Sequence, residues 1–120
     1  MERVTGVGGI FFKAKDPKAL GEWYARHLGI DVQEWGGAAF QGEGTTIWSP
    51  FKEDTKYFEP STAPFMLNYR VADLDAMLAQ LREAGVQVDE KVQDSEYGKF
   101  GWAMDPEGNR FELWQPPAET

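Results

Sequence analysis

An internal repeat constrains the fold of this chain more than any other feature of its sequence. Asp16 and Asp73 each precede a run of apolar residues at helical spacing, and the two runs end at Gly29 and Gly85. The spacing is nearly constant, because 57 residues separate the two aspartates and 56 separate the two glycines. Such self-similarity predicts one supersecondary unit that the chain uses twice.

Each predicted helix lies among segments with strand character. Alternating side chains predict a strand at 7–14 before the first helix and another at 65–71 before the second. Glycine-bounded or alternating segments predict further strands after the helices, at 31–35, 38–41, 45–49, 86–93, 100–104 and 110–114. Between the two units, residues 51–64 lose all periodicity and are rich in charged and turn-forming residues, which predicts a linker.

The sequence therefore predicts an α+β fold in which two tandem βαβββ modules form one domain over residues 1–120. The first module covers residues 7–50, the linker 51–64 and the second module 65–117. A chain of this length suits one compact domain. Each helix needs an apolar sheet face to cover, so we expect a mixed, cup-shaped sheet of eight strands with both helices outside. The concave inner face of such a sheet is a natural site for a small molecule.

The motif Asp-Pro-Glu-Gly-Asn at 105–109 predicts a tight turn near the end of the chain. Proline presets φ for a turn, glycine accepts a positive φ, and Asx side chains bond their own backbone. A hairpin closed by this turn pairs Met104 with Arg110, Trp102 with Glu112 and Phe100 with Trp114. All six side chains then share one face of the sheet, and Glu112 is the single carboxylate on it.

Strand alternation nominates the remaining residues of the concave face. We assign the more apolar alternate of each strand to the helix side and the other alternate to the cup. The residues expected to contact a ligand are Phe11, Lys13, Trp48, Met66, Asn68, Arg70, Trp102, Met104, Arg110, Glu112 and Trp114. The tryptophans either stack on a planar ligand or fill a core or dimer interface. The arginines either bind an anionic group or are solvated or paired.

Charge and composition exclude several classes of partner. The net charge of -8 disfavours binding to nucleic acid and to anionic membrane surfaces. No apolar run approaches the length of a membrane span, and the N-terminus does not have the pattern of a secretion signal. The chain has no cysteine, so it has neither disulfides nor thiolate chemistry. These features predict a cytoplasmic protein.

The repeated unit, together with Asp-Pro-Glu-Gly-Asn-x-x-Glu-Leu-Trp-x-Pro at 105–116, resembles the vicinal oxygen chelate superfamily. This superfamily includes glyoxalase I, bleomycin resistance proteins and extradiol dioxygenases. The resemblance extends over residues 7–117 and implies a homodimer. In metal-dependent members it also implies four metal-binding positions, which here hold Gly9, Thr46, Met66 and Glu112. Only Glu112 is a ligand type, so no metal or other cofactor is predicted, and a divalent metal is the disfavoured alternative.

The resemblance and the aromatic composition favour a binding protein. It would hold a small planar or aromatic molecule in an aromatic-lined cup without a metal, in the manner of bleomycin resistance proteins. The alternative is a lyase, isomerase or dioxygenase that uses a degenerate metal site or Glu112 as a general base. Glu112 has a structural interpretation as well, as the salt-bridge partner of Arg70, Arg110 or Lys13. A role as a dimeric partner or regulator also stays open.

Overall fold

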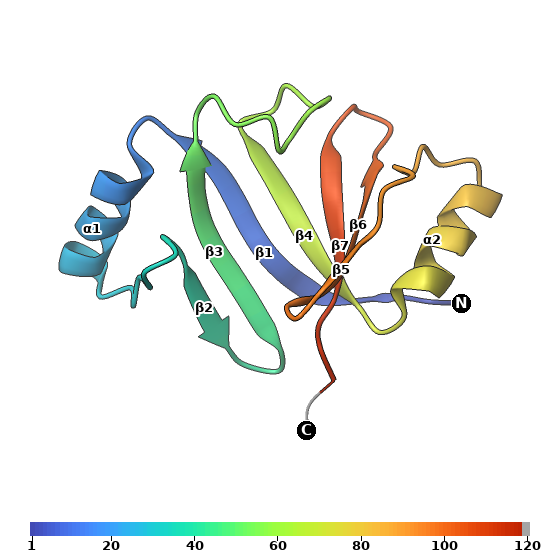
Figure 1. Cartoon of the computed structure of the whole chain (residues 1–120), viewed down its shortest axis with the longest axis horizontal. Coiled ribbons are helices and arrows are strands. Elements are labelled where there is room, and N and C mark those ends of the chain that lie inside the picture. Colours follow the sequence, from blue (N-terminus) through green and yellow to red (C-terminus); the bar gives the residue numbers. More distant parts are fainter. Residues whose placement is uncertain (119–120) are drawn as a thin grey trace.

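A computed structural model describes residues 1–118 and contains one sheet of seven strands and two helices (Figure 1). The helices are α1 (Pro17–Leu28) and α2 (Leu74–Glu83). The strands are β1 (Val4–Ala14), β2 (Ala38–Gln41), β3 (Thr45–Lys52), β4 (Phe65–Val71), β5 (Gln93–Ser95), β6 (Gly98–Met104) and β7 (Arg110–Gln115). The predicted α+β class is confirmed. Neither of the two described helices is long and apolar enough to cross a membrane.

The sheet is mixed and strongly curved. Its strand order is β2-β3-β1-β4-β7-β6-β5. Strands β1 and β3 are parallel, as are β4 and β7, and the other neighbours are antiparallel. Figure 1 shows β1 and β4 in the middle of the sheet, with α1 and α2 at its two ends. The first strands of the two halves of the chain therefore meet at the centre, and the sheet curls around one concave face.

The strand predicted at 31–35 is absent from the described chain, so the sheet has seven strands and not eight. These residues form a turn, in which the amide of Gln33 donates to the carbonyl of Gly37 at 2.8 Å and the amide of Gly36 donates to Gln33 at 2.9 Å. Gly36 adopts a φ of 98°, and the Trp35 side chain is exposed. Local hydrogen bonds satisfy this backbone, so it has no need of a strand partner.

The strand predicted at 86–93 is also placed differently. Val88 makes one isolated bridge to Ala103, and the regular strand β5 begins only at Gln93. The second half of the chain keeps the predicted order of strand, helix and three strands, whereas two strands follow the helix in the first half.

Both helices begin and end as their sequence predicts. The carboxylate of Asp16 accepts a hydrogen bond from the amide of Ala19 at 3.0 Å, and that of Asp73 accepts one from the amide of Ala76 at 3.0 Å. Gly29 ends α1 with a φ of 68°, a conformation that glycine adopts without steric cost. Local side-chain chemistry is thus sufficient to set the helix ends.

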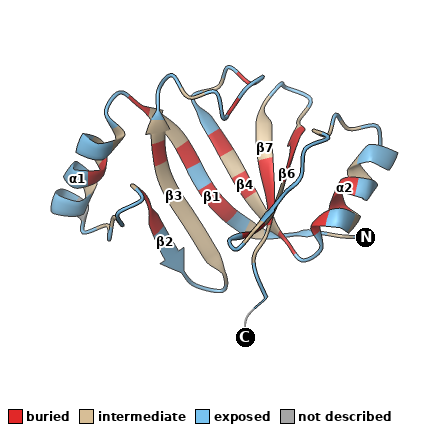
Figure 2. Ribbon diagram, viewed as in Figure 1, coloured by how far each residue is buried: buried red, intermediate tan, exposed pale blue. Residues whose placement is uncertain are grey.

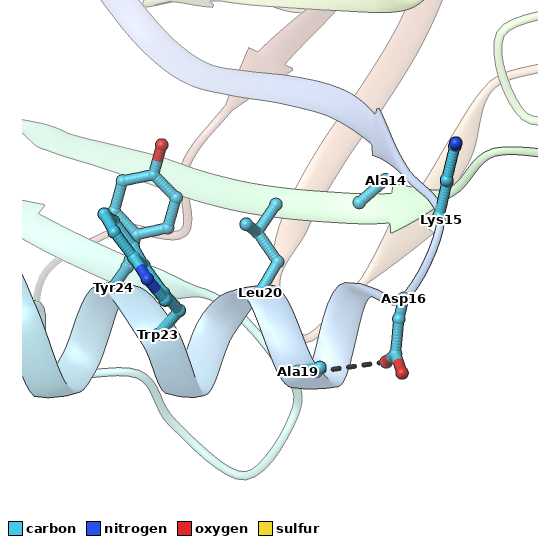
Figure 3. A pocket seen from close by; sticks show the side chains of 7 residues that line it. All are labelled: Ala14, Lys15, Asp16, Ala19, Leu20, Trp23 and Tyr24. Atoms are coloured by element: carbon cyan, nitrogen blue, oxygen red, sulfur yellow. Dashed lines mark hydrogen bonds between the residues drawn. The ribbon is translucent and has the colours of Figure 1, made fainter.

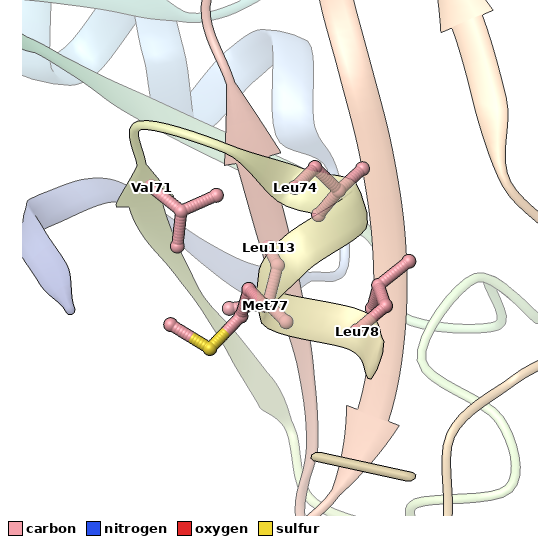
Figure 4. Close-up of a cluster of buried hydrophobic side chains, with 5 residues drawn as sticks. All are labelled: Val71, Leu74, Met77, Leu78 and Leu113. Carbon is pink, nitrogen blue, oxygen red and sulfur yellow. The ribbon is translucent and has the colours of Figure 1, made fainter. Parts of the chain in front are cut away.

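A compact core lies between α2 and the sheet. It contains Val71, Leu74, Met77, Leu78 and Leu113, which are all at most 5 % exposed (Figure 4). Leu113 comes from β7, so this core fixes the outer face of the strand that carries Glu112. Figure 2 shows the buried residues concentrated on the inner side of α2 and along the central strands.

The turn at 105–109 has the predicted structure. The Asp105 carboxylate accepts hydrogen bonds from the amides of Glu107 at 2.9 Å and Asn109 at 3.0 Å, and Gly108 has a φ of 81°. These hydrogen bonds, first among them that from Asn109, lower the pKa of Asp105. The strand register confirms the predicted pairs: Met104 with Arg110, Trp102 with Glu112 and Phe100 with Trp114. The turn thereby determines the face on which Glu112 lies.

Candidate functional site

Glu112 lies on the concave face and is almost completely buried, with 1 % of its surface exposed. Its carboxylate accepts three hydrogen bonds from neutral donors. Asn68 Nδ2 donates to Oε1 at 2.6 Å, Trp102 Nε1 donates to Oε2 at 2.9 Å, and the Tyr57 hydroxyl also donates to Oε2. The two ion pairs formed by residues 1–118 involve other carboxylates, so the predicted salt bridge to Glu112 is wrong. Hydrogen bonds, not a paired cation, hold this carboxylate.

Burial dominates the electrostatics of the site. It raises the pKa of Glu112, although the hydrogen bonds from Tyr57, Asn68 and Trp102 and the charge of Arg110 act in the opposite direction. Burial and the neighbouring Glu112 carboxylate also raise the pKa of Tyr57, so the phenol keeps its proton and acts as a donor. The site therefore holds one carboxyl group whose protonated form is favoured by burial.

The segment between β3 and β4 supplies two aromatic residues that the sequence assigned only to a linker. Phe58 is 1 % exposed and lies in a buried cluster with Phe11, Met66 and Trp102. Tyr57 stacks on Phe51 with a centroid separation of 5.6 Å and makes an edge contact with Trp102. The presence of aromatic residues in an otherwise polar segment was the sequence signal that could have indicated a buried role for this segment. The centre of the concave face is therefore filled by the chain itself.

Strand β3 contributes different residues to the concave face from those predicted. Trp48 packs on the opposite face, against Phe12 at 5.5 Å and Tyr24 of α1 at 5.2 Å. Ile47 packs against the concave cluster instead, because β3 pairs with β1 so that Ile47 lies beside Gly9. The predicted alternation of β3, and with it the placement of Trp48 in the cup, is wrong by one residue. Trp48 thus provides apolar surface on the outer face of the sheet, against which α1 packs.

The other predicted residues lie on or beside the concave face. Phe11, Met66 and Trp102 pack in one cluster with Phe58, and Asn68 and Trp102 donate hydrogen bonds to Glu112. The Lys13 ammonium lies 5.7 Å from the centre of the Phe58 ring. Trp114 stacks on Phe100 with an angle of 7° between the rings and donates from Nε1 to the carbonyl of Tyr97 at 2.9 Å.

Arg110 lies at the rim of this cluster. Its guanidinium lies over the Trp102 ring at 5.2 Å and pairs with the Asp89 carboxylate at 3.3 Å. A hydrogen bond from the Lys91 amide, together with Arg110, lowers the pKa of Asp89. Met104 and Arg110 line a small cavity of about 250 Å³ beside this ion pair. Arg110 is thus already committed to an ion pair and an aromatic ring.

A larger cavity of about 530 Å³ lies outside the concave face, between the end of β1 and α1 (Figure 3). Leu20, Trp23 and Tyr24 provide most of its apolar wall. The Asp16 carboxylate at its edge already accepts the capping hydrogen bond from Ala19. The concave face, with its buried carboxyl group, is the better candidate for a functional site.

The four positions that the sequence resemblance assigns to metal ligands do not suit a metal ion. Gly9 has no ligating side chain, Met66 is fully buried in the apolar cluster, and the Thr46 hydroxyl donates to the carbonyl of Val7 at 2.9 Å. Both oxygens of Glu112 already accept hydrogen bonds. Within residues 1–118, no group of three or more His, Cys, Asp or Glu side chains is arranged to hold a metal ion.

Fold and sequence now identify the class of protein. A family model described as a glyoxalase-like domain matches residues 9–114, and the chain belongs to this family. This family assignment confirms the resemblance to glyoxalase-related proteins that the sequence predicted. The sequence matches none of the curated proteins with which it was compared.

Several solved structures share the fold. Methylmalonyl-CoA epimerase from Mycobacterium tuberculosis is 24% identical, with a TM-score of 0.66 over 96% of this chain and 90% of that chain. A variant of the Streptomyces coelicolor methylmalonyl-CoA epimerase, in complex with 2-nitronate-propionyl-CoA, is 19% identical, with a TM-score of 0.75 over 97% of this chain and 100% of that chain. A glyoxalase/bleomycin resistance protein/dioxygenase superfamily member from Vibrio splendidus 12B01 is 14% identical, with a TM-score of 0.61 over 96% and 99% of the two chains.

Proposed function

We propose that this protein binds a small planar or aromatic molecule on its concave face without a metal ion. The observation that carries the proposal is the environment of Glu112, a buried carboxyl group surrounded by hydrogen-bond donors and aromatic rings. Such a combination of flat apolar surface and one oriented polar group is typical of a small-molecule site. The structures of related fold that contain acyl-CoA compounds also support a small-molecule site on this scaffold.

The way in which Tyr57 is held supports a binding site that opens. Two of the three donors to Glu112, Asn68 and Trp102, come from strands, whereas Tyr57 comes from a segment without regular structure. Tyr57 is 37% exposed even though its hydroxyl reaches the buried carboxylate. In our proposal a planar ligand replaces the Tyr57 ring between Phe51 and Trp102 and directs a hydrogen-bond donor to Glu112.

The proposal is tested by titration with 2-naphthol, a planar probe with one hydroxyl donor, followed by tryptophan fluorescence and calorimetry. The substitution Tyr57→Ala removes the internal competitor, so we expect it to tighten 2-naphthol binding about tenfold, as when a competing closed state is removed. Tyr97→Ala is the matched control, because Tyr97 is 69% exposed in a turn, and this variant should bind like the wild type. Failure of both the wild type and Tyr57→Ala to bind the probe would contradict the proposal.

An enzymatic function is the second candidate, and the raised pKa of Glu112 favours it. A carboxyl group whose pKa is raised by burial is suited to general base catalysis near neutral pH in an isomerase or lyase. The substitution Glu112→Gln distinguishes the two candidates. Loss of turnover with retained ligand binding would support the enzyme, whereas weakened binding without any turnover in the wild type would support the binding protein.

We also propose that the protein acts in the cytoplasm as a homodimer. The absence of cysteine supports the first proposal and the superfamily resemblance supports the second. Light scattering of the eluted protein during size-exclusion chromatography measures the oligomeric state directly, and a monomer mass would contradict the dimer.

A further inference from the structure

Arg70 lies on the concave face at the opposite end of β4 from the Phe58 cluster, and three glycines make room for it. A Cβ atom added to Gly6 would lie 2.4 Å from Arg70 Nη2, and one added to Gly44 would lie 1.8 Å from Nη1. A Cβ added to Gly8 would lie 2.9 Å from Arg70 Cγ. Two of these glycines belong to β1, and Gly44 belongs to the turn before β3. Glycines from two segments therefore form a cradle that accommodates one arginine side chain.

The guanidinium of Arg70 has little to bind within the described chain. The two ion pairs of residues 1–118 do not include Arg70, and its side chain makes one long hydrogen bond, from Nη2 to the carbonyl of Val7 at 3.4 Å. Arg70 Nε is buried and has no hydrogen-bond partner. An unsatisfied buried donor destabilises the folded state, and a ligand that accepts a hydrogen bond from it would offset that loss.

A second unpartnered polar atom lies beside the first. Asn68 precedes Arg70 by two residues on the same face of β4, and it is 2% exposed. Its Nδ2 donates to Glu112, but its Oδ1 has no partner and lies 2.2 Å from the Cβ position of Gly8. The Trp114 ring also approaches this position, at 2.9 Å. An unused acceptor, the aliphatic stem of Arg70 and an indole ring thus converge over Gly8, while the guanidinium lies over Gly6 and Gly44.

We propose that Arg70 and Asn68 form an anion site on the concave face, beside Trp114 and apart from the Tyr57 ring, and that its ligand is an aromatic acid with a hydrogen-bond donor next to its carboxylate. The carboxylate pairs with the planar guanidinium, and the adjacent hydroxyl or amine donates to Asn68 Oδ1. This inference rests on the proposed binding function and narrows its ligand class. The net charge of the chain is -8, but the charge of Arg70 is available to an anion because no carboxylate of the described chain pairs with it.

Salicylate is the probe, since it has a hydroxyl beside its carboxylate. Benzoate lacks the hydroxyl and salicylamide lacks the charge. We expect salicylate to bind about tenfold more tightly than salicylamide, and more tightly than benzoate by a smaller factor, as is usual for the loss of a charged and of a neutral hydrogen bond. Arg70→Gln should remove the preference over salicylamide, whereas Arg82→Gln, which makes the same charge change on α2, should keep it.

Two glycines of one turn give a matched pair of variants that leave the charge unchanged. Gly44→Ala places a methyl group against the flexible end of Arg70 and should displace the guanidinium, whereas a Cβ at Gly42 meets no atom within 4 Å. Neither glycine has a positive φ, so alanine fits both backbones. We expect Gly44→Ala to lose the salicylate preference and Gly42→Ala to retain it.

Acetate separates this inference from the proposed function, because it tests the Arg70 end without an aromatic ring. The NMR signal of Arg70 Nε–H, assigned by its loss in Arg70→Lys, should shift when acetate is added. No shift with acetate, or an unchanged salicylate preference in Arg70→Gln and Gly44→Ala, would overturn the inference even if 2-naphthol binds. Absence of 2-naphthol binding with a retained acetate shift would overturn the proposed planar site and leave the anion site.

Discussion

The substitution Tyr57→Phe tests the hydrogen bond on which the described site depends. It removes only the hydroxyl that donates to Glu112, while the ring keeps its contacts with Phe51 and Trp102. A hydrogen bond to a charged group contributes about 1.5–3 kcal/mol, and partial exposure of Tyr57 allows water to replace part of it. We therefore expect the free energy of unfolding to fall by about 1–2 kcal/mol at a pH where Glu112 is ionised.

The pH dependence of this loss has a definite sign. Burial raises the pKa of Glu112 in the folded state, so the folded state binds the proton more tightly than the unfolded state. Stability from this group is therefore greatest below the unfolded pKa, about 4.3, and decreases as the pH rises through the raised folded value. The Tyr57 hydrogen bond lowers the pKa of Glu112 and limits that decrease. Tyr57→Phe should thus cost more stability at high pH than at low pH.

Urea denaturation of the wild type and Tyr57→Phe at several pH values, from about 4 to about 9, measures this effect. The comparison requires that the free energy of unfolding falls with urea concentration at the same slope in both proteins. Tyr97→Phe is the control, since it deletes the same hydroxyl from an exposed side chain. Equal stability of Tyr57→Phe and wild type at high pH would refute the role of the hydrogen bond. A loss that increases toward low pH would refute the assignment of a raised Glu112 pKa.

Three further substitutions test the scaffold that holds the site. Leu78→Ala should lower the free energy of unfolding by about 2–5 kcal/mol in urea, because Leu78 is 2% exposed in the core under α2. Gly98→Ala should lower the free energy of unfolding by about 1–3 kcal/mol, because Gly98 has a φ of 116° and a Cβ there would lie 2.4 Å from the carbonyl of Gln115. Gly42→Ala is the control and should leave the free energy of unfolding unchanged. Asp105→Ala should lower the melting temperature at neutral pH, and the difference from wild type should vanish on acidification. The pKa of Asp105 is lowered in the folded state, so the stabilisation by its carboxylate is lost as the pH falls through the folded pKa. A constant difference at every pH would contradict the role of the Asp105 carboxylate.

Glu112 occupies one of the four positions that bind metal in metal-dependent relatives, but here the carboxylate is surrounded differently. Three neutral donors occupy its oxygens, and one of them, Trp102, also packs in the apolar cluster with Phe58 and Met66. Neutral donors can stabilise a buried carboxylate without a cation when its oxygens are fully hydrogen-bonded. This arrangement does not suit a metal ion, and it agrees with the ligand binding that we propose for the site.

Local signals in the sequence were sufficient for much of the fold. The helix ends follow from Asp16, Asp73 and Gly29, whose side chains or backbone act on residues next to them. The register of the last hairpin follows from the turn at 105–109 in the same way. One failure is also local in origin. Residues 31–35 have strand composition, but their backbone hydrogen bonds close within the turn, which the alternation of side chains does not reveal.

The sequence by itself determined that Glu112 faces inward on an aromatic sheet, because a short turn fixes register and register fixes the face. Only the tertiary structure decided what meets it there. Tyr57 reaches Glu112 across 55 residues of sequence, and Trp48 turns toward α1 instead of the cup. The glycine cradle of Arg70 likewise joins β1 to the turn before β3. Such contacts depend on how strands pair and curve in space, and no periodicity along the chain specifies them.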